Sequence, residues 1–118
     1  MSEAPVIVDL PSAPLHLAND PVLRRAKEGL KKIYGDRLAG VIVYGSRARG
    51  DNRPDSDYDL LALIKNHSKR ADGDAAAKLS TEIFLEGGHV VSFLTLPDDG
   101  LAQRTGFMFN VRHEGFML

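Results

Sequence analysis

Two short segments, close together in the sequence, constrain the fold of this chain most strongly. Residues 45–50 read Gly-Ser-Arg-Ala-Arg-Gly and follow an apolar run at 41–44, and residues 56–60 read Ser-Asp-Tyr-Asp-Leu. The β-branched and aromatic run predicts a buried strand. The residues at 46–56, rich in Gly, Asp, Asn, Pro and Arg, predict a turn with room for one helical turn. A second strand is expected at 57–64, so the fold must contain two strands joined by a short connection.

The rest of the chain predicts helices around these strands. A helix should begin at Asp20 and Pro21, because Asp is a good N-cap and Pro fits the first helical position. Its core-facing stripe would be Val22, Ala26, Leu30 and Ile33. We then expect a polar loop at 65–72, a helix at 75–85 with Leu79, Ile83 and either Ala76 or Phe84 inward, a strand at 89–96 and a helix at 98–113. This order indicates an α/β fold, a small single domain with a short mixed sheet flanked by helices.

The first residues are expected to lie apart from this pattern. The chain of 118 residues is long enough for one domain with a modest core. Residues 1–19 are predicted to form an N-terminal arm and residues 20–118 the folded domain. The apolar residues at 6–8 and Leu10 could form a short edge strand or an extended arm, since the prolines that follow argue against a central strand. The arm could pack on another subunit or on its own domain.

Composition excludes several classes of protein. The chain has no cysteine, so disulfides and thiolate metal sites are excluded. No apolar run reaches the roughly 20 residues of a membrane helix, and residues 1–5 lack the pattern of a signal peptide. A cytoplasmic protein without membrane contact is expected. The net charge of -1 argues against direct nucleic-acid binding. Five basic residues lie on the first predicted helix, as a solvated face or as a surface for RNA or an acidic partner: Arg24, Arg25, Lys27, Lys31 and Lys32.

The turn after the first strand has the composition of a phosphate site. Gly45 lacks a Cβ, so a polyphosphate can approach the backbone closely. Ser46 can donate a hydroxyl hydrogen bond, and Arg47 and Arg49 are charged donors that could hold phosphate oxygens. If a helical turn follows, its free N–H groups point at the anion. The plainer interpretation is an ordinary strand-to-helix turn with solvated arginines.

The two aspartates of the second strand have the composition of a metal site. Asp57 and Asp59 share one strand face, roughly 7 Å apart along the chain. Carboxylate oxygens suit Mg²⁺, which usually takes phosphate oxygens as further ligands. The alternative is a pair of exposed acids. The joint pattern is more specific than either half, and it indicates a magnesium-dependent site for nucleoside triphosphates.

This joint pattern resembles the polymerase-β-like nucleotidyltransferase superfamily, and in particular its minimal, single-domain, antitoxin-like branch. The resemblance covers about residues 20–115. The string Arg-His-Glu-Gly at 112–115 is also similar to the closing segment of many small members. The resemblance implies the nucleotidyltransferase α/β fold for residues 20–118. It also implies triphosphate binding by Gly45 and Ser46, and magnesium ligation by the catalytic Asp57 and Asp59.

The resemblance further implies a reaction and a partner. The reaction would move a nucleoside monophosphate, AMP as the expected one, from a triphosphate to an acceptor hydroxyl, with release of pyrophosphate. Minimal members are commonly encoded beside a helical HEPN partner, an RNase toxin, and act as its antitoxin, in some cases by adenylylating it. A toxin–antitoxin system with ATP as the nucleotide is therefore expected.

The chain departs from the superfamily at one position. Two-metal nucleotidyl transfer uses a third carboxylate on a later strand, and the aligned position here is Ser92. A serine hydroxyl cannot replace a carboxylate as metal ligand and base. Asp51, Glu86 or an acid from a partner chain could take its place. His89 could act as a base or be structural.

Three hypotheses follow from this departure. The chain could be an active transferase, or a catalytically weakened or inactive nucleotide-binding antitoxin that restrains a partner by contact, or a structural domain that keeps the motif as a relic. Aromatic and apolar residues close to position 118 could contact a partner or a second copy of the chain, or complete the core: Phe107, Phe109, Phe116 and Met117.

Overall fold

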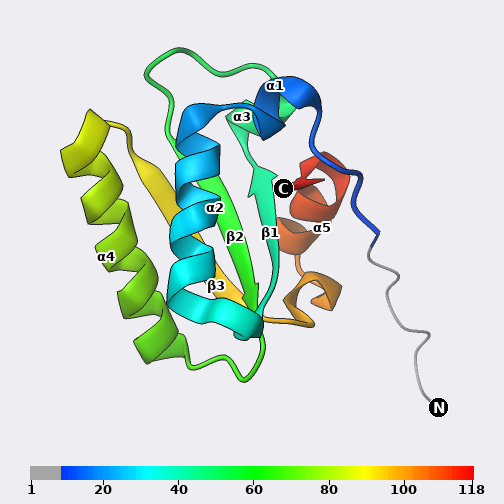
Figure 1. Cartoon of the computed structure of the whole chain (residues 1–118). Helices are drawn as coiled ribbons and strands as arrows, with labels where there is room; N and C mark the ends of the chain where they lie inside the picture. The colour runs from blue at the N-terminus through cyan, green and yellow to red at the C-terminus, as the bar shows by residue number, and fades with distance from the viewer. Residues whose placement is uncertain (1–8) are drawn as a thin grey trace.

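The computed structural model describes residues 9–118 as a four-stranded sheet with helices on both faces (Figure 1). The helices are α1 (Leu15–Ala18), α2 (Pro21–Tyr34), α3 (Ser46–Arg49), α4 (Lys69–Gly87) and α5 (Gly106–Glu114). The strands are β1 (Leu38–Tyr44), β2 (Tyr58–Ile64), β3 (Val91–Pro97) and β4 (Phe116–Met117). Short 3₁₀ turns lie at Gly35–Arg37 and Gly100–Ala102. The strand or arm predicted from residues 6–8 falls outside the described residues.

The sheet is mixed, as predicted. Its strand order is β3-β2-β1-β4, with β1 antiparallel to β2 and β4, and β2 parallel to β3. One face packs on α2 and α4, and the other on α5 (Figure 1). Successive side chains of β2 alternate between these faces: Leu60 belongs to the α2/α4 core and Leu61 to the α5 core. Asp59 therefore lies on the α5 face, and Tyr58 on the opposite one.

Helix α2 begins where the sequence predicts but is rotated from the predicted phase. The Asp20 carboxylate caps it by accepting hydrogen bonds from the backbone N–H of Val22 at 2.8 Å and of Leu23 at 3.4 Å. Ile33, predicted to be in the core, is 39% exposed, and Tyr34 is buried instead. The buried residues of the helix are Leu23, Ala26, Gly29, Leu30 and Tyr34. Both stripes fit a period of 3.6 residues, so contacts with the sheet and α4 decide between them.

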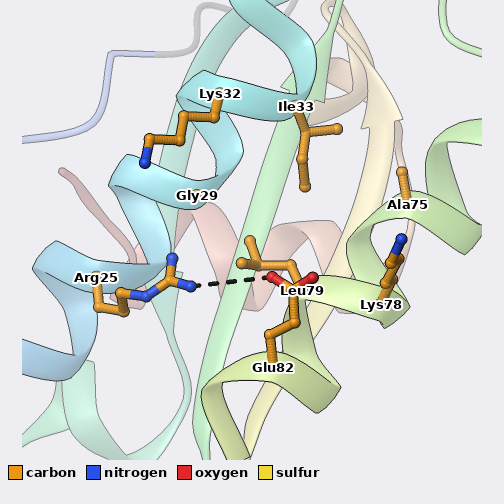
Figure 2. A pocket seen from close by; sticks show the side chains of 8 residues that line it. All are labelled: Arg25, Gly29, Lys32, Ile33, Ala75, Lys78, Leu79 and Glu82. Atoms are coloured by element: carbon orange, nitrogen blue, oxygen red, sulfur yellow. Dashed lines mark ion pairs between the residues drawn. The ribbon is translucent and has the colours of Figure 1, made fainter. Parts of the chain in front are cut away.

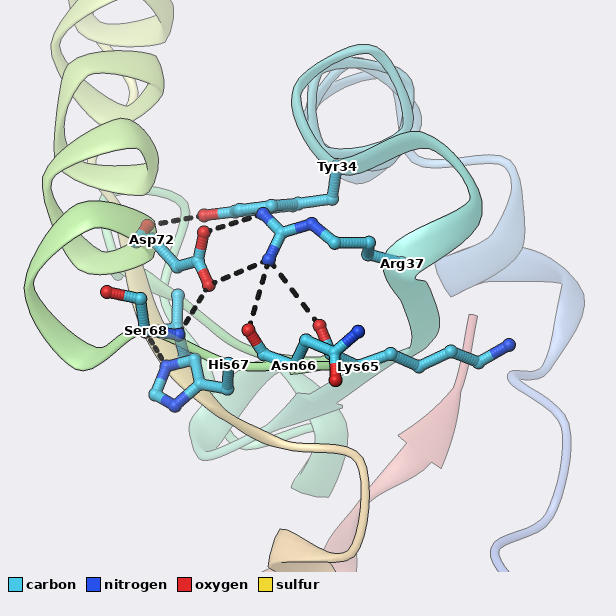
Figure 3. A network of polar contacts seen from close by, with 8 residues as sticks. Tyr34, Arg37, Lys65, Asn66, His67, Ser68 and Asp72 are labelled. Carbon is cyan, nitrogen blue, oxygen red and sulfur yellow. Dashed lines mark hydrogen bonds and ion pairs between the residues drawn. The ribbon is translucent and has the colours of Figure 1, made fainter.

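Helix α4 begins earlier than predicted, so the loop expected at 65–72 is wrong for its last four residues. The helix starts at Lys69, and its first turn is held by Asp72 (Figure 3). The Asp72 carboxylate accepts a hydrogen bond from the backbone N–H of Ser68 at 2.8 Å and pairs with the Arg37 guanidinium at 2.7 Å. A polar sequence thus becomes helical through a contact with a distant residue. Ala76 is buried as expected, together with Leu79 and Ile83, and Phe84 is exposed.

The helix predicted at 98–113 is two elements, and a strand follows that the sequence did not predict. Thr105 caps α5 by accepting a hydrogen bond from the backbone N–H of Met108 at 3.1 Å. The Arg112 guanidinium donates to the carbonyls of Leu101 at 2.6 Å and Gln103 at 2.8 Å, which ties the 3₁₀ turn to α5. Strand β4 then pairs with Ile42 and Val43 of β1.

The described part of the predicted arm packs on this domain. Leu17 of α1 is only 4% exposed and belongs to the α2/α4 core. The backbone N–H of Ala13 donates to the Met117 carbonyl, and the Met117 N–H donates to the Pro11 carbonyl, both at 2.8 Å. Within residues 9–118, none of the helices combines the length and hydropathy needed to cross a membrane.

Candidate functional site

The end of β1 and the start of β2 bring Gly45 and Asp59 into contact. Tyr44 pairs directly with Asp59 in the antiparallel register, and Gly45 follows with a φ of 77°. A Cβ built on Gly45 would clash with the Asp59 carboxylate and lie only 3.2 Å from its Cγ. A residue with a side chain would therefore be both strained and obstructed here. The glycine-serine bend and the acidic strand predicted from the sequence thus meet at one point.

Helix α3 is the single helical turn predicted inside the connection. The N–H groups of Arg49 and Gly50 donate to the carbonyls of Gly45 at 3.1 Å and of Ser46 at 2.9 Å. The N–H groups of the first helical residues have no partner within so short a helix. Half-buried Ser46 starts the turn directly beside the Asp59 contact. Backbone and hydroxyl donors are therefore available at the bend for an anionic group.

Arg49 lies at this site and is held in place by two acids. Its Nε donates to Asp51 and one terminal nitrogen to Glu114 of α5, both at 3.1 Å. Its charge also acts on Asp59, whose pKa it lowers against other effects. Glu114 belongs to the string Arg-His-Glu-Gly at 112–115, whose members had no separate predicted roles. This string has a structural role, because Glu114 orients Arg49 at the bend.

Arg47 is turned away from Asp59 and braces the loop between α3 and β2. Its guanidinium donates to the carbonyls of Pro54 at 3.2 Å and Ser56 at 2.8 Å, and it lies 4.0 Å from the centre of the Tyr58 ring. Tyr58 faces α2, on the other side of the sheet. These contacts commit Arg47 to the loop, and its assignment to phosphate binding stays a prediction.

Opposing effects act on the pKa of the Asp59 carboxyl group. Partial burial raises its pKa, the neighbouring Asp57 charge raises it further, and Arg49 opposes both effects. Asp57 itself is exposed. A cation bound between the two carboxylates would hold both ionised, and Mg²⁺ is commonly bound by one or two carboxylates plus phosphate oxygens. The donor set of Asp57 and Asp59 therefore fits this ion.

Ser92 occupies the position next to Asp59 on the neighbouring strand. The two residues are register partners in the parallel pairing of β2 with β3, and Ser92 is exposed. Asp51 is paired with Arg49, and Glu86 is paired with Arg25 at 3.0 Å beside α2, on the other face. The ring of His89 packs against the ring of Tyr58, with ring centres 6.3 Å apart, also on that face. Across residues 9–118, no three His, Cys, Asp or Glu side chains form a group that could hold a metal ion.

The sequence of residues 23–104 matches the family model described as a nucleotidyltransferase domain. This match spans more than half of the chain. The chain belongs to the nucleotidyltransferase domain family.

Two relatives from Methanocaldococcus jannaschii carry the name "putative protein adenylyltransferase". One is 28% identical over 101 residues, which cover 84% of this chain and 96% of the relative. Another is 30% identical over 71 residues, which cover 60% of this chain and 72% of the relative. This chain is similar to both over most of their lengths.

Solved structures show the same fold. A toxin–antitoxin crystal structure with AMP-PNP superposes with a TM-score of 0.56 at 15% identity, covering 78% of this chain and 68% of that one. A "putative nucleotidyltransferase" from Sulfolobus solfataricus gives a TM-score of 0.51 at 23% identity, covering 81% of this chain and 78% of that one. The small mixed-sheet architecture is therefore that of the nucleotidyltransferase fold.

A cavity of this domain lies away from the bend. It has a volume of about 310 Å³ and opens between α2 and α4, where Arg25 faces Glu82 at 3.9 Å (Figure 2). Gly29 and Leu79 also line it, and both belong to the α2/α4 packing. Because Asp59 is on the opposite face of the sheet, this cavity is separate from the candidate site.

Proposed function

We propose that this protein transfers a nucleoside monophosphate, AMP, from a nucleoside triphosphate to a hydroxyl group of an acceptor protein. The observation that supports the proposal most is the contact between Gly45 and the Asp59 carboxylate, which puts an acidic side chain against the glycine-serine bend. Membership of the nucleotidyltransferase domain family supports the reaction class. The names of the M. jannaschii relatives support AMP and a protein acceptor.

The residues of the bend would act mainly by positioning. Ser46 and the free N–H groups of α3 would hold phosphate oxygens, and Arg49, oriented by Glu114, would add a charged donor. Asp57 and Asp59 would hold Mg²⁺, which neutralises charge on the triphosphate. In the reaction, the acceptor oxygen forms a bond to the α-phosphorus and releases its proton to solvent. The bond from the α-phosphorus to the bridging oxygen breaks, and pyrophosphate leaves.

The partner that best fits the proposal is a HEPN-type toxin. Two of the similar structures are toxin–antitoxin structures, one of them with AMP-PNP. A domain of this size has little surface with which to hold an acceptor of its own, so the acceptor would be carried by the partner. The protein would then act as an antitoxin that modifies its toxin.

A second function is favoured by one observation. The position beside Asp59 on β3 is Ser92, and within the described residues Asp51 and Glu86 pair with arginines instead of joining the carboxylates. A site with two acids can still bind a nucleotide with its metal. The protein would then restrain its partner by contact, as a nucleotide-binding module without efficient transfer.

The experiment that tests both functions follows the α-phosphate of ATP. Wild type and Ser92→Asp are incubated with Mg²⁺ and α-labelled ATP, with and without the protein encoded by the neighbouring gene, and γ-labelled ATP is the control for phosphoryl transfer. We expect α-label on the partner with wild type, and more with Ser92→Asp if the missing acid limits the reaction. Metal-dependent ATP binding without any α-label transfer by wild type would support the binding module. Absence of both binding and transfer would contradict both functions.

A further inference from the structure

Two phenylalanines of α5 remain exposed and do not complete the core. Phe107 is 46% exposed and Phe109 is 53% exposed. Their neighbours differ. Phe107 lies nearly perpendicular to the Tyr44 ring, with ring centres 5.6 Å apart, whereas Phe109 stacks on His113 at 4.2 Å. Two residues apart on a helix, they project in nearly opposite directions.

Phe107 contacts a residue that adjoins the candidate nucleotide site. Tyr44, its contact, pairs with Asp59 and directly precedes Gly45. Tyr44 and Asp59 are register partners in the antiparallel pairing, so their side chains lie side by side on the α5 face of the sheet. Glu114 lies seven positions after Phe107, on the same face of α5. Because Glu114 pairs with Arg49, this face of α5 borders the bend at two points.

We propose that Phe107, steadied by Tyr44, is the stacking platform for the base of the nucleotide whose phosphates bind at Gly45 and Ser46. This inference rests on the proposed nucleotide site and deepens it. The platform offers an exposed aromatic surface beside a site where phosphate and metal would bind, and it is held by a second ring. A base attached through a ribose to phosphates at the bend would have this surface within reach.

The platform has a consequence for base selection. Stacking on an aromatic ring accepts every base, because each base presents a π-face, and discrimination comes from hydrogen bonds to base edges. Among the described contacts, Phe107 meets the ring of Tyr44, and the Arg49–Glu114 pair lies about two helical turns further along α5. Binding through Phe107 should therefore stabilise ATP and GTP to a similar extent.

The test compares Phe107→Ala with Phe109→Ala as the matched control. Binding of Mg-ATP, Mg-GTP and inorganic tripolyphosphate with Mg²⁺ is measured by calorimetry, after thermal unfolding has confirmed that both variants are folded. We expect Phe107→Ala to weaken both nucleotides by about 10-fold and to leave tripolyphosphate binding unchanged. Phe109→Ala should match wild type for all three ligands, and Phe107→Trp should restore nucleotide affinity.

Three results would overturn the platform without contradicting the proposed binding of phosphates at Gly45 and Ser46. One is an equal loss for tripolyphosphate, which would mean that the phosphate site itself is damaged. Another is an equal loss in Phe109→Ala. The third is unchanged ATP affinity with reduced α-label transfer, which would assign Phe107 to the acceptor protein. If wild type binds neither nucleotide nor tripolyphosphate, the proposed site is wrong and the platform is overturned with it.

Discussion

Asp72 and Asp59 show two opposite ways in which a carboxylate can be placed in a fold. Asp72 is 5% exposed and receives hydrogen bonds from both terminal nitrogens of Arg37, at 2.7 and 3.2 Å, and from the Ser68 N–H (Figure 3). The hydrogen bond from Arg37 is the main cause that holds its pKa below the usual range, although burial opposes it. Asp59 is half-buried, faces the acid Asp57, and has a raised pKa.

The difference is the one expected between a carboxylate that stabilises a fold and one that binds a cation. The neighbours of Asp72 favour its charged form, so the group contributes to the stability of the fold. Burial and the Asp57 charge disfavour the charged form of Asp59 more than Arg49 favours it, so a cation bound there would be stabilising. Raised pKa values of this kind are typical of functional sites, although ion-pair networks also shift pKa values.

The largest expected effect is on nucleotide binding. The double variant Asp57→Ala plus Asp59→Ala should lose magnesium-dependent ATP affinity by at least about 100-fold, because even loss of an outer-shell contact commonly weakens metal binding 10–100-fold. Calorimetry with Mg-ATP measures the change. Asp72→Ala, assayed at a temperature where it is folded, should bind like wild type. Unchanged affinity in the double variant would remove the distinction between the two carboxylates.

The next largest effect is on stability, where replacing Asp72 should cost more than replacing Asp59. Asp72→Ala should lower the free energy of unfolding by about 2 kcal/mol, because it leaves the Ser68 N–H and the Arg37 guanidinium without their partner. Asp59→Ala should change it by less than about 0.5 kcal/mol or increase it, because a repulsion is removed. Urea unfolding measures both. Asp74→Ala, an exposed acid on the same helix as Asp72, is the control.

The smallest effect is on the pH dependence of stability, to which the two carboxylates should contribute with opposite sign. The lowered pKa of Asp72 contributes stability above about pH 4, its unfolded value, and that contribution is lost as pH falls through the folded pKa. The raised pKa of Asp59 acts in the opposite sense: its contribution is present below about pH 4 and is lost as pH rises through the folded pKa.

Urea unfolding between pH 3 and pH 7 separates these two contributions. Relative to wild type, Asp72→Asn should lose less stability on acidification and Asp59→Asn should lose more. Parallel pH curves for the two variants would contradict the opposite pKa shifts.

Local signals in the sequence were enough for the elements that form the site. Asp20 capping α2, the apolar run of β1, the glycine-serine bend and the alternation of β2 each depend on residues close in sequence. These elements were therefore predicted nearly where the structure has them, and the convergence of Asp59 on Gly45 follows from their antiparallel pairing.

Features that depend on distant residues were not predicted. The first turn of α4 needs Arg37, which is 35 positions from Asp72, and the orientation of Arg49 needs Glu114, which is 65 positions away. The phase of α2 is fixed by packing, since Ile33 and Tyr34 both satisfy a helical period. From the sequence, Phe107 could contact a partner, contact a second copy of the chain or complete the core, and its ring contact with Tyr44 could not be predicted.

Strand β4 has a consequence for the order of events during synthesis. It lies between β1 on one side and the segment near Ser12 on the other, so residues about a hundred positions apart must meet before this edge of the sheet is closed. Such long-range pairings form late in folding. A ribosome that has translated only as far as β3 carries Gly45, Asp57 and Asp59 but not yet Phe107 or Glu114. The nascent chain therefore acquires the carboxylate pair before it acquires the residues of α5 that border the bend.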